Sequence, residues 1–161
     1  MGEKIIYPLS FSHLSFADDP IYFFQCMAEE NLKPDIQNRA DIERLVDHFY
    51  QQVKKDELIG PIFTEVVPLV WEIHMPIMYE FWETVLFQGN YRGRPIPKHI
   101  ALDKKFPLQE VHFTRWKALF FESLDSMFAG PVAEKARNKV QLMEKIIWTK
   151  VQASRQKGFI Q

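Results

Sequence analysis

The sequence contains a single cysteine, Cys26, and only 6 glycines among 161 residues. One cysteine cannot form an internal disulfide, and the absence of a CxxC pair or a cysteine–histidine cluster argues against structural zinc. We therefore expect a reducing, cytoplasmic environment. No apolar run approaches the roughly 18 residues of a membrane-spanning helix. The first residues also lack a basic segment followed by a long apolar core, so no secretory signal is expected.

The sequence also lacks an excess of charge of either sign. The net charge is −1, from 20 basic and 21 acidic residues. No global field therefore favours nucleic acid or an anionic membrane, and we expect neither as a partner. Glycine-rich phosphate loops, Ser/His/Asp arrangements and paired metal-ligand motifs are missing as well.

The sequence is rich in aromatic residues, with 14 Phe and 4 Trp in a chain that is 47% hydrophobic. A chain of this length forms one ordinary domain with a substantial core. Flat apolar rings suit the walls of a pocket for a large flat ligand, although a well-packed core uses the same rings.

Residues 1–34 differ from the rest of the chain because they are more acidic and rich in aromatic rings. A segment this apolar is not expected to remain a solvated tail. We predict an N-terminal extension (1–34) that packs on the main domain (35–153) or on a second subunit, and a polar tail (154–161). The alternative is that translation starts at Met27 and the earlier residues are incidental. The rings of the extension are Tyr7, Phe11, Phe16, Tyr22, Phe23 and Phe24.

Residues 40–55 have the period of an amphipathic helix, with apolar residues on one side at 3.6-residue spacing. Asp41 is an acidic residue of its first turn. Tyr50 lies at the margin of the apolar stripe, where its ring can be buried while its hydroxyl needs a partner, which is usually backbone or water. The stripe consists of Ile42, Leu45, Val46, Phe49 and Val53.

A second helix is predicted for residues 70–87, and His74 lies in the middle of its apolar face. The histidine should therefore face inward, either as a satisfied core residue, which is the commoner case, or as a ligand contact. Pro76 removes a backbone donor, so we expect a kink, a tight first turn or a helix start close to it. The other members of the face are Trp71, Met78, Phe81 and Val85.

Residues 88–97 have the composition of a loop, and Pro95 and Pro97 stiffen the short segment that holds His99. An imidazole in a fixed orientation can present one neutral ring nitrogen to a metal while the other donates to a carbonyl or carboxylate. The alternative is a loop histidine in solvent.

The stretch from Pro107 to about Phe128 is strongly amphipathic, and its first turn would tolerate the proline. Trp116 lies on its apolar face, where a buried indole N–H needs an acceptor from a carbonyl, a side chain or a ligand. Gly130-Pro131 then opens a last helix. With neither strand-like alternation nor an internal repeat, we predict an all-α fold whose four main helices form two crossing antiparallel pairs.

Several segments of the sequence match a known family. The most specific is Phe87-Gln88-Gly89-Asn90-Tyr91-Arg92-Gly93-Arg94-Pro95, leading to Lys98-His99, with Phe106 and Trp116 beyond; Phe49-Tyr50, Gly60-Pro61-Ile62-Phe63 and Glu80-Phe81-Trp82 agree as well. On these residues the chain resembles the truncated haemoglobins of the third group, over about residues 35–148. The resemblance implies a globin-like, two-over-two helical sandwich around haem b.

The resemblance also implies roles for individual residues. His99 matches the proximal iron ligand, Tyr50 and His74 match the distal pair, and Trp116 matches the distal tryptophan. Pro76 departs from the family pattern, and a kink there could swing the His74 imidazole outward. The implied haem-pocket residues are Phe49, Phe63, Met78, Phe81, Arg92, Lys98, Phe106 and Phe113.

Such a pocket implies a haem protein that binds dioxygen, nitric oxide and other diatomic ligands too tightly for bulk delivery. Tight binding suits detoxification of nitric oxide or peroxide, supported by a reductase. A carrier and an enzyme share the same pocket, so the sequence does not separate the two, and monomer and homodimer are equally open. The alternative is a haem-free all-α interaction module whose N-terminal extension binds a partner.

Overall fold

The computed structural model describes residues 33–156, and these form helices and connecting loops without strands. Except for Lys33 and Pro34, the predicted extension lies outside the described residues, as does most of the predicted tail. None of the described helices is long and apolar enough to cross a membrane. The elements are α2 (Arg39–Lys55), the π-helical turn η2 (Ile62–Val66), α3 (Trp71–Leu86), α4 (Pro95–Lys105), α5 (Glu110–Met127) and α6 (Pro131–Ser154).

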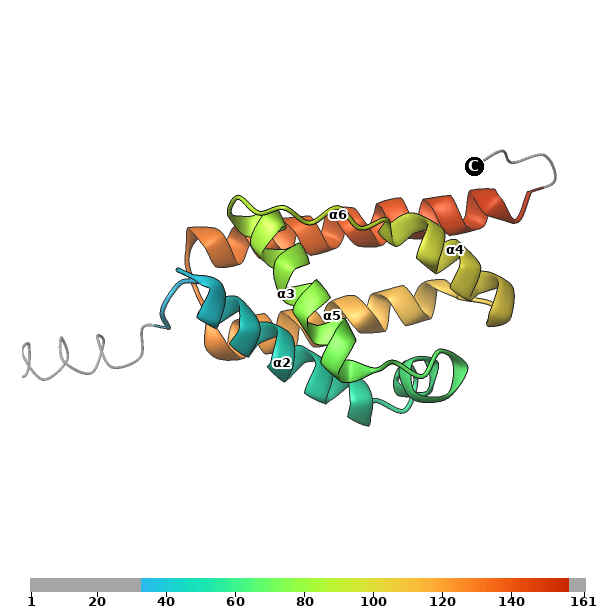
Figure 1. The fold of residues 1–161 in the computed structure, drawn as a ribbon, viewed down its shortest axis with the longest axis horizontal. Helices are drawn as coiled ribbons and strands as arrows, with labels where there is room; N and C mark the ends of the chain where they lie inside the picture. Colours follow the sequence, from blue (N-terminus) through green and yellow to red (C-terminus); the bar gives the residue numbers. More distant parts are fainter. Residues whose placement is uncertain (1–32, 157–161) are drawn as a thin grey trace, which may run out of the picture. The chain divides into compact units, whose positions relative to one another are not determined.

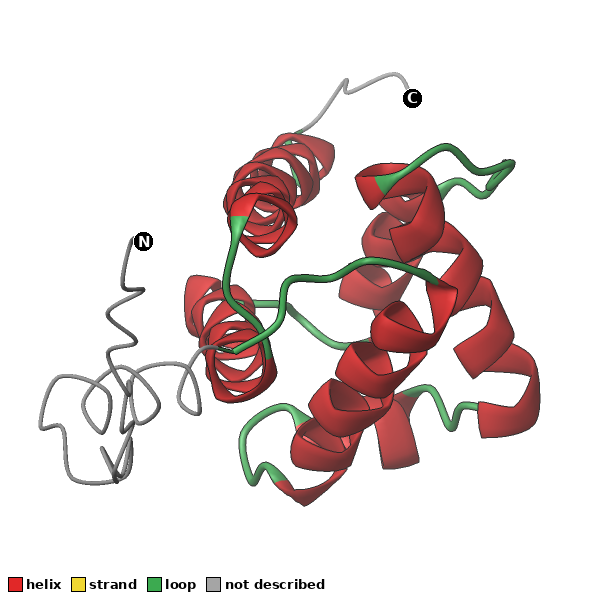
Figure 2. Cartoon of the chain, turned by 90° about the vertical axis from the view of Figure 1, so that its left-hand side faces the viewer, coloured by secondary structure: helices red, strands yellow, loops and turns green. Residues whose placement is uncertain are grey.

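The long helices form two pairs. The first pair is α2 with α3 and the second is α5 with α6, while α2 also packs on α5 and α3 on α6. Figure 1 shows α5 and α6 side by side, and Figure 2 shows them nearly end-on with the first pair crossing them. The shorter α4 packs on α6. The predicted all-α fold of two crossed helix pairs is thus confirmed.

Phe120 stands where three helices meet. Its fully buried ring stacks on Trp82 of α3 at 4.7 Å between centroids and packs edge-on against Phe49 of α2 at 5.3 Å. Burial of one such ring contributes about 1.5–3 kcal/mol. The apolar faces predicted from the sequence therefore converge on a shared aromatic core.

Three predicted boundaries differ from the structure. α4 begins at Pro95, so the loop predicted to reach Pro97 is wrong. Prolines are accommodated there because the first turn of a helix has no internal partners for its N–H groups. Pro107 lies outside α5, which begins at Glu110. A helix start at Pro76 is also excluded, since α3 already begins at Trp71.

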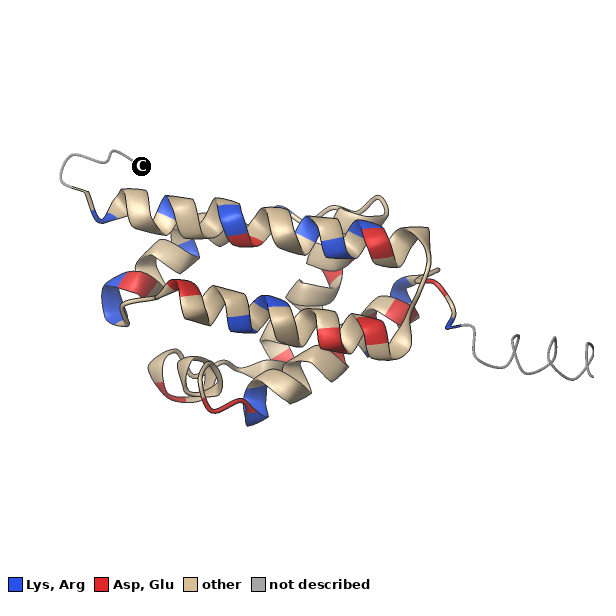
Figure 3. Ribbon diagram, turned by 180° about the vertical axis from the view of Figure 1, so that it is seen from behind, with Lys and Arg blue, Asp and Glu red and all other residues tan. Residues whose placement is uncertain are grey.

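Asp35 fixes the start of α6 from a distance. Gly130, the residue before the helix, has no side chain to cap it, and the Asp35 carboxylate accepts instead from Val132 N at 2.9 Å and Ala133 N at 2.8 Å. These two N–H groups belong to the first turn and lack partners within the helix. Charged residues of both signs occur along α5 and α6 (Figure 3), and Lys117 Nζ of α5 pairs with Glu144 Oε2 of α6 at 2.7 Å.

Candidate functional site

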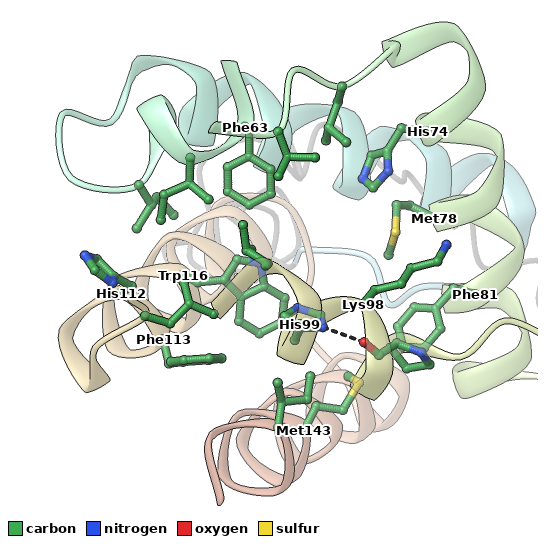
Figure 4. A pocket seen from close by; sticks show the side chains of 18 of the residues that line it. Phe63, His74, Met78, Phe81, Lys98, His99, His112, Phe113, Trp116 and Met143 are labelled. Atoms are coloured by element: carbon green, nitrogen blue, oxygen red, sulfur yellow. Dashed lines mark hydrogen bonds between the residues drawn. The ribbon is translucent and has the colours of Figure 1, made fainter. Parts of the chain in front are cut away.

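A cavity of about 570 Å³ opens between the helix pairs and α4. A volume of this size suits a cofactor or drug-sized ligand. Its walls are mostly apolar, and histidines from different elements point into it. Figure 4 shows His99 on one wall and His74 on the opposite wall.

His99 is held in one orientation by its own helix. Its Nδ1 lies 2.8 Å from the carbonyl oxygen of Pro95, one turn earlier in α4 (Figure 4). A carbonyl only accepts, so Nδ1 carries the proton and Nε2 keeps a free lone pair. Burial lowers the pKa of His99, and the Pro95 bond opposes that shift in part. The ring is thus neutral at pH 7 and is a competent metal ligand through Nε2.

Tyr50 and His74 meet on the opposite wall. The Tyr50 hydroxyl lies 3.0 Å from His74 Nε2, and the tyrosine side chain is buried, with 6% of its surface exposed. Burial raises the pKa of Tyr50, which keeps the hydroxyl protonated. Burial lowers the pKa of His74, as does the nearby positive charge of Lys98. Two neutral polar groups therefore face His99 across the cavity.

The structure settles the direction of His74, which the sequence had left in question. Despite Pro76 in the same helix, the imidazole lines the cavity and contacts Tyr50. It lies edge-on to Tyr50, with 5.2 Å between ring centroids. The inward direction expected from the apolar face of this helix is thus what is observed.

Trp116 contributes a further polar group, its indole N–H. Its ring is edge-on to Phe49 at 5.7 Å between centroids and lines the cavity from α5. Within residues 33–156 no hydrogen-bond acceptor contacts its indole N–H. The backbone carbonyl considered as the ordinary acceptor is not found in this range.

Most of the predicted pocket residues line the cavity, with two exceptions. Arg92 is exposed in the loop before α4, and Phe106 packs against His112 at 5.4 Å between centroids. Neither is part of the cavity wall. The predicted residues that do line it are Phe49, Tyr50, Phe63, His74, Met78, Phe81, Lys98, His99, Phe113 and Trp116.

The sequence did not identify the wall that α6 contributes. Met143 and Ile147 lie four residues apart on one face of α6 and line the cavity, but helical spacing alone does not say which element that face meets. His112, at the start of α5, was also missed. It both receives a bond from Gln109 N and lines the cavity. Further unpredicted lining residues are Tyr91, Leu102, Leu108, Glu144 and Ile146.

Comparisons with known proteins agree with this geometry. No protein-family model matches the chain. The group 3 truncated haemoglobin ctb of Campylobacter jejuni is 33% identical over 110 residues, which is 66% of this chain and 84% of that protein. The chain belongs to the third group of truncated haemoglobins. The crystal structure of the group III truncated haemoglobin from Campylobacter jejuni matches with a TM-score of 0.65 and 27% identity, covering 74% of this chain and 95% of that one.

Membership of the truncated haemoglobins implies a haem cofactor, and the cavity fits one. The fit rests on the donor set: His99 Nε2 has no hydrogen-bond partner among residues 33–156, and His99 lines a largely apolar cavity. Lys98 and Lys105 are exposed and also line the cavity, where their charges can meet the acidic groups of a bound porphyrin.

Proposed function

We propose that this truncated haemoglobin holds haem b through His99 and binds dioxygen and other diatomic ligands with high affinity. When bound, the haem supplies the iron centre that takes the ligand. The observation that carries the proposal is the Tyr50–His74 contact of 3.0 Å, placed opposite His99 in an apolar cavity. Lys98 and Lys105 would hold the propionates.

His99 acts on the proximal side as a fixed, neutral ligand. His99 Nδ1–H donates a hydrogen bond to the Pro95 carbonyl oxygen, so Nε2 is the nitrogen left to bind the metal. Because a hydrogen bond of this kind fixes ring orientation and tautomer, the imidazole needs little rearrangement on metal binding.

Tyr50 has one proton and therefore one hydrogen bond to donate. If His74 Nε2 carries a hydrogen, it donates to the Tyr50 oxygen, and the tyrosine proton is free for a bound ligand. If the other tautomer is present, Tyr50 donates to His74 instead. The Nε2–H form of His74 is accordingly the one that presents Tyr50 to the ligand. Trp116, which lines the cavity, serves as a second donor through its indole N–H.

Apolar side chains complete the distal side. Phe63, Met78 and Phe81 line the cavity and exclude water from the donors. Hydrogen bonds in such a dry site are stronger than in water. A polarised ligand with a partial negative charge would be stabilised there, as donors fixed in advance need no reorganisation.

Detoxification of nitric oxide or peroxide is the activity that this donor set favours over delivery of dioxygen. It would require a reductase to restore the ferrous state. Stopped-flow mixing of the oxygenated protein with nitric oxide tests it, with nitrate as the product measured. We expect nitrate to form much faster than with free haem. A rate no higher than that of free haem would contradict the detoxification activity, and reversible ligand binding would be the function that is kept.

A further inference from the structure

The first turn of α3 carries His74, and its backbone is not capped by a side chain. Val70, the residue before the helix, makes no capping hydrogen bond through its side chain. Pro76 has no N–H, so the Glu72 carbonyl one turn earlier lacks its usual helical partner. Ile73 N and His74 N still donate to the Val70 carbonyl oxygen at 3.0 and 2.9 Å, so the turn keeps these backbone hydrogen bonds but lacks the one that Pro76 would have donated.

Trp71, the first residue of α3, packs behind the Tyr50–His74 pair. Its ring lies edge-on to Tyr50 at 5.6 Å and to His74 at 6.0 Å between centroids. Tyr50 and His74 both line the cavity, but Trp71 does not. The indole can therefore affect a ligand only indirectly, and Tyr50 and His74 are cavity-lining residues that it contacts.

Lys54 lies over the ring of Trp71 and makes a cation–π contact with it. Its Nζ lies 3.8 Å from the centroid of the Trp71 ring. Lys54 is one turn after Tyr50 in α2, and His74 is one turn after Trp71 in α3, so each pair lies on one face of its own helix. A cation this close to an indole face is attracted by the negative face of the ring.

We propose that Trp71, held by its cation–π contact with Lys54, is a positioning residue that keeps the His74 imidazole turned toward Tyr50 and thereby limits ligand entry. The inward and outward imidazole form a two-state equilibrium, and the edge contacts with Trp71 exist only in the inward state. Losing them raises the outward population, and ligands then enter faster. This inference rests on the proposed function, since the entering ligand is one that binds haem.

The test uses flash photolysis of carbon monoxide from the ferrous, haem-loaded protein. We expect Trp71→Leu to raise the association rate about three- to tenfold, since the aromatic contacts and the cation–π contact together correspond to roughly that factor. Lys54→Met should raise the association rate less than Trp71→Leu does. Trp71→Phe keeps an aromatic ring and should leave the rate close to that of the parent protein. Lys55→Met removes a neighbouring exposed charge that makes no cation–π contact in the described range, and should change nothing.

The decisive arm repeats Trp71→Leu in a His74→Leu background. If Trp71 acts through the imidazole, the substitution has no further effect there. An equal acceleration in both backgrounds, or none in either, overturns the proposal. Nuclear Overhauser contacts between the Tyr50 and His74 rings, measured without a paramagnetic centre, provide a readout that needs no haem. They should weaken in Trp71→Leu. Protein that takes up no haem would refute the proposed function, and the ring contacts would still decide the role of Trp71.

Discussion

The Tyr50 hydroxyl and His74 Nε2 lie 3.0 Å apart and join α2 to α3 on the wall that faces His99. Two residues separated by 24 positions in the sequence are thus joined by one hydrogen bond on this wall of the cavity. The state of either group determines what the other can offer a ligand, so the pair has to be tested as a unit.

Removing the Tyr50 hydroxyl should accelerate loss of dioxygen. A hydrogen bond to a partly charged ligand contributes about 1.5–3 kcal/mol, and each ~1.4 kcal/mol is tenfold. We expect Tyr50→Phe to raise the dissociation rate by about tenfold or more, as measured by stopped-flow displacement with carbon monoxide. Trp116→Phe should act in the same direction. An unchanged rate in both variants would mean that neither group donates to the ligand.

The same rate should be insensitive to alkali over a wide range. Burial raises the pKa of Tyr50, so the hydroxyl keeps its proton where an ordinary tyrosine, with a pKa of about 10, begins to lose it. His74, whose pKa is lowered by burial and by Lys98, is already neutral at pH 7. We predict a flat dissociation rate from pH 7 to about pH 10. A rate that climbs through that range with the profile of an exposed phenol would contradict the assignment.

Arg155 should stabilise the fold through Asp103. Its Nε donates to Asp103 Oδ2 at 2.9 Å, while Leu108 N donates to Oδ1 at 2.8 Å. Arg155→Leu leaves a buried carboxylate with less hydrogen bonding and should cost about 1–3 kcal/mol in urea unfolding. Arg44→Leu, which breaks an ion pair between the exposed Arg44 and Asp41, is the control and should cost less than about 1 kcal/mol.

The contribution of Asp103 has a definite pH dependence. The hydrogen bond from Arg155 is the main cause that lowers the pKa of Asp103 from its ordinary 3.8, against the effect of burial. A carboxyl with a lowered folded-state pKa stabilises the protein above the ordinary value, and the stabilisation disappears as the pH falls through the folded-state value. The difference in unfolding free energy between the parent and Arg155→Leu should therefore shrink below about pH 4. A difference that grows in acid would refute this account.

Gly130 should tolerate no side chain. Its φ of 133° is one that residues with a Cβ rarely adopt, and an added Cβ would lie 2.6 Å from the carboxyl carbon of Asp35. Gly130→Ala therefore strains the backbone and displaces the group that caps α6. We expect a loss of about 2 kcal/mol or more in unfolding free energy, beyond the ~1 kcal/mol of a lost cap in Asp35→Ala. An alanine variant as stable as the parent would show that the turn relaxes freely.

The sequence predicted those parts of the fold that depend on local pattern. The apolar face of α2, the inward direction of His74 and the start of α6 at Pro131 all follow from residue spacing or from the chemistry of proline and glycine. The start of α4 was missed because Pro95 and Pro97 are as typical of a loop as of a first helical turn. The start of α5 was missed because Asp103 holds Leu108 N outside the helix, a contact that spacing does not reveal.

The same distinction between local pattern and contacts of distant segments applies to the candidate site. Individual residues such as Tyr50 and Trp116 could be proposed from their place on a helix face and from the family resemblance. The Tyr50–His74 bond depends on how two helices cross, and the α6 wall depends on packing between distant segments. Both required the three-dimensional structure, because periodicity fixes which side of a helix is buried but not which partner buries it.

Haem attachment through His99 is the central claim, and absorbance spectra of matched variants test it most directly. Parent protein, His99→Ala and His74→Ala are each purified, supplied with haem and separated from the excess. The parent and His74→Ala should retain a Soret band, while His99→Ala should lose it or keep it only with added imidazole. A parent protein that stays colourless, or a band lost in His74→Ala and kept in His99→Ala, would contradict the account.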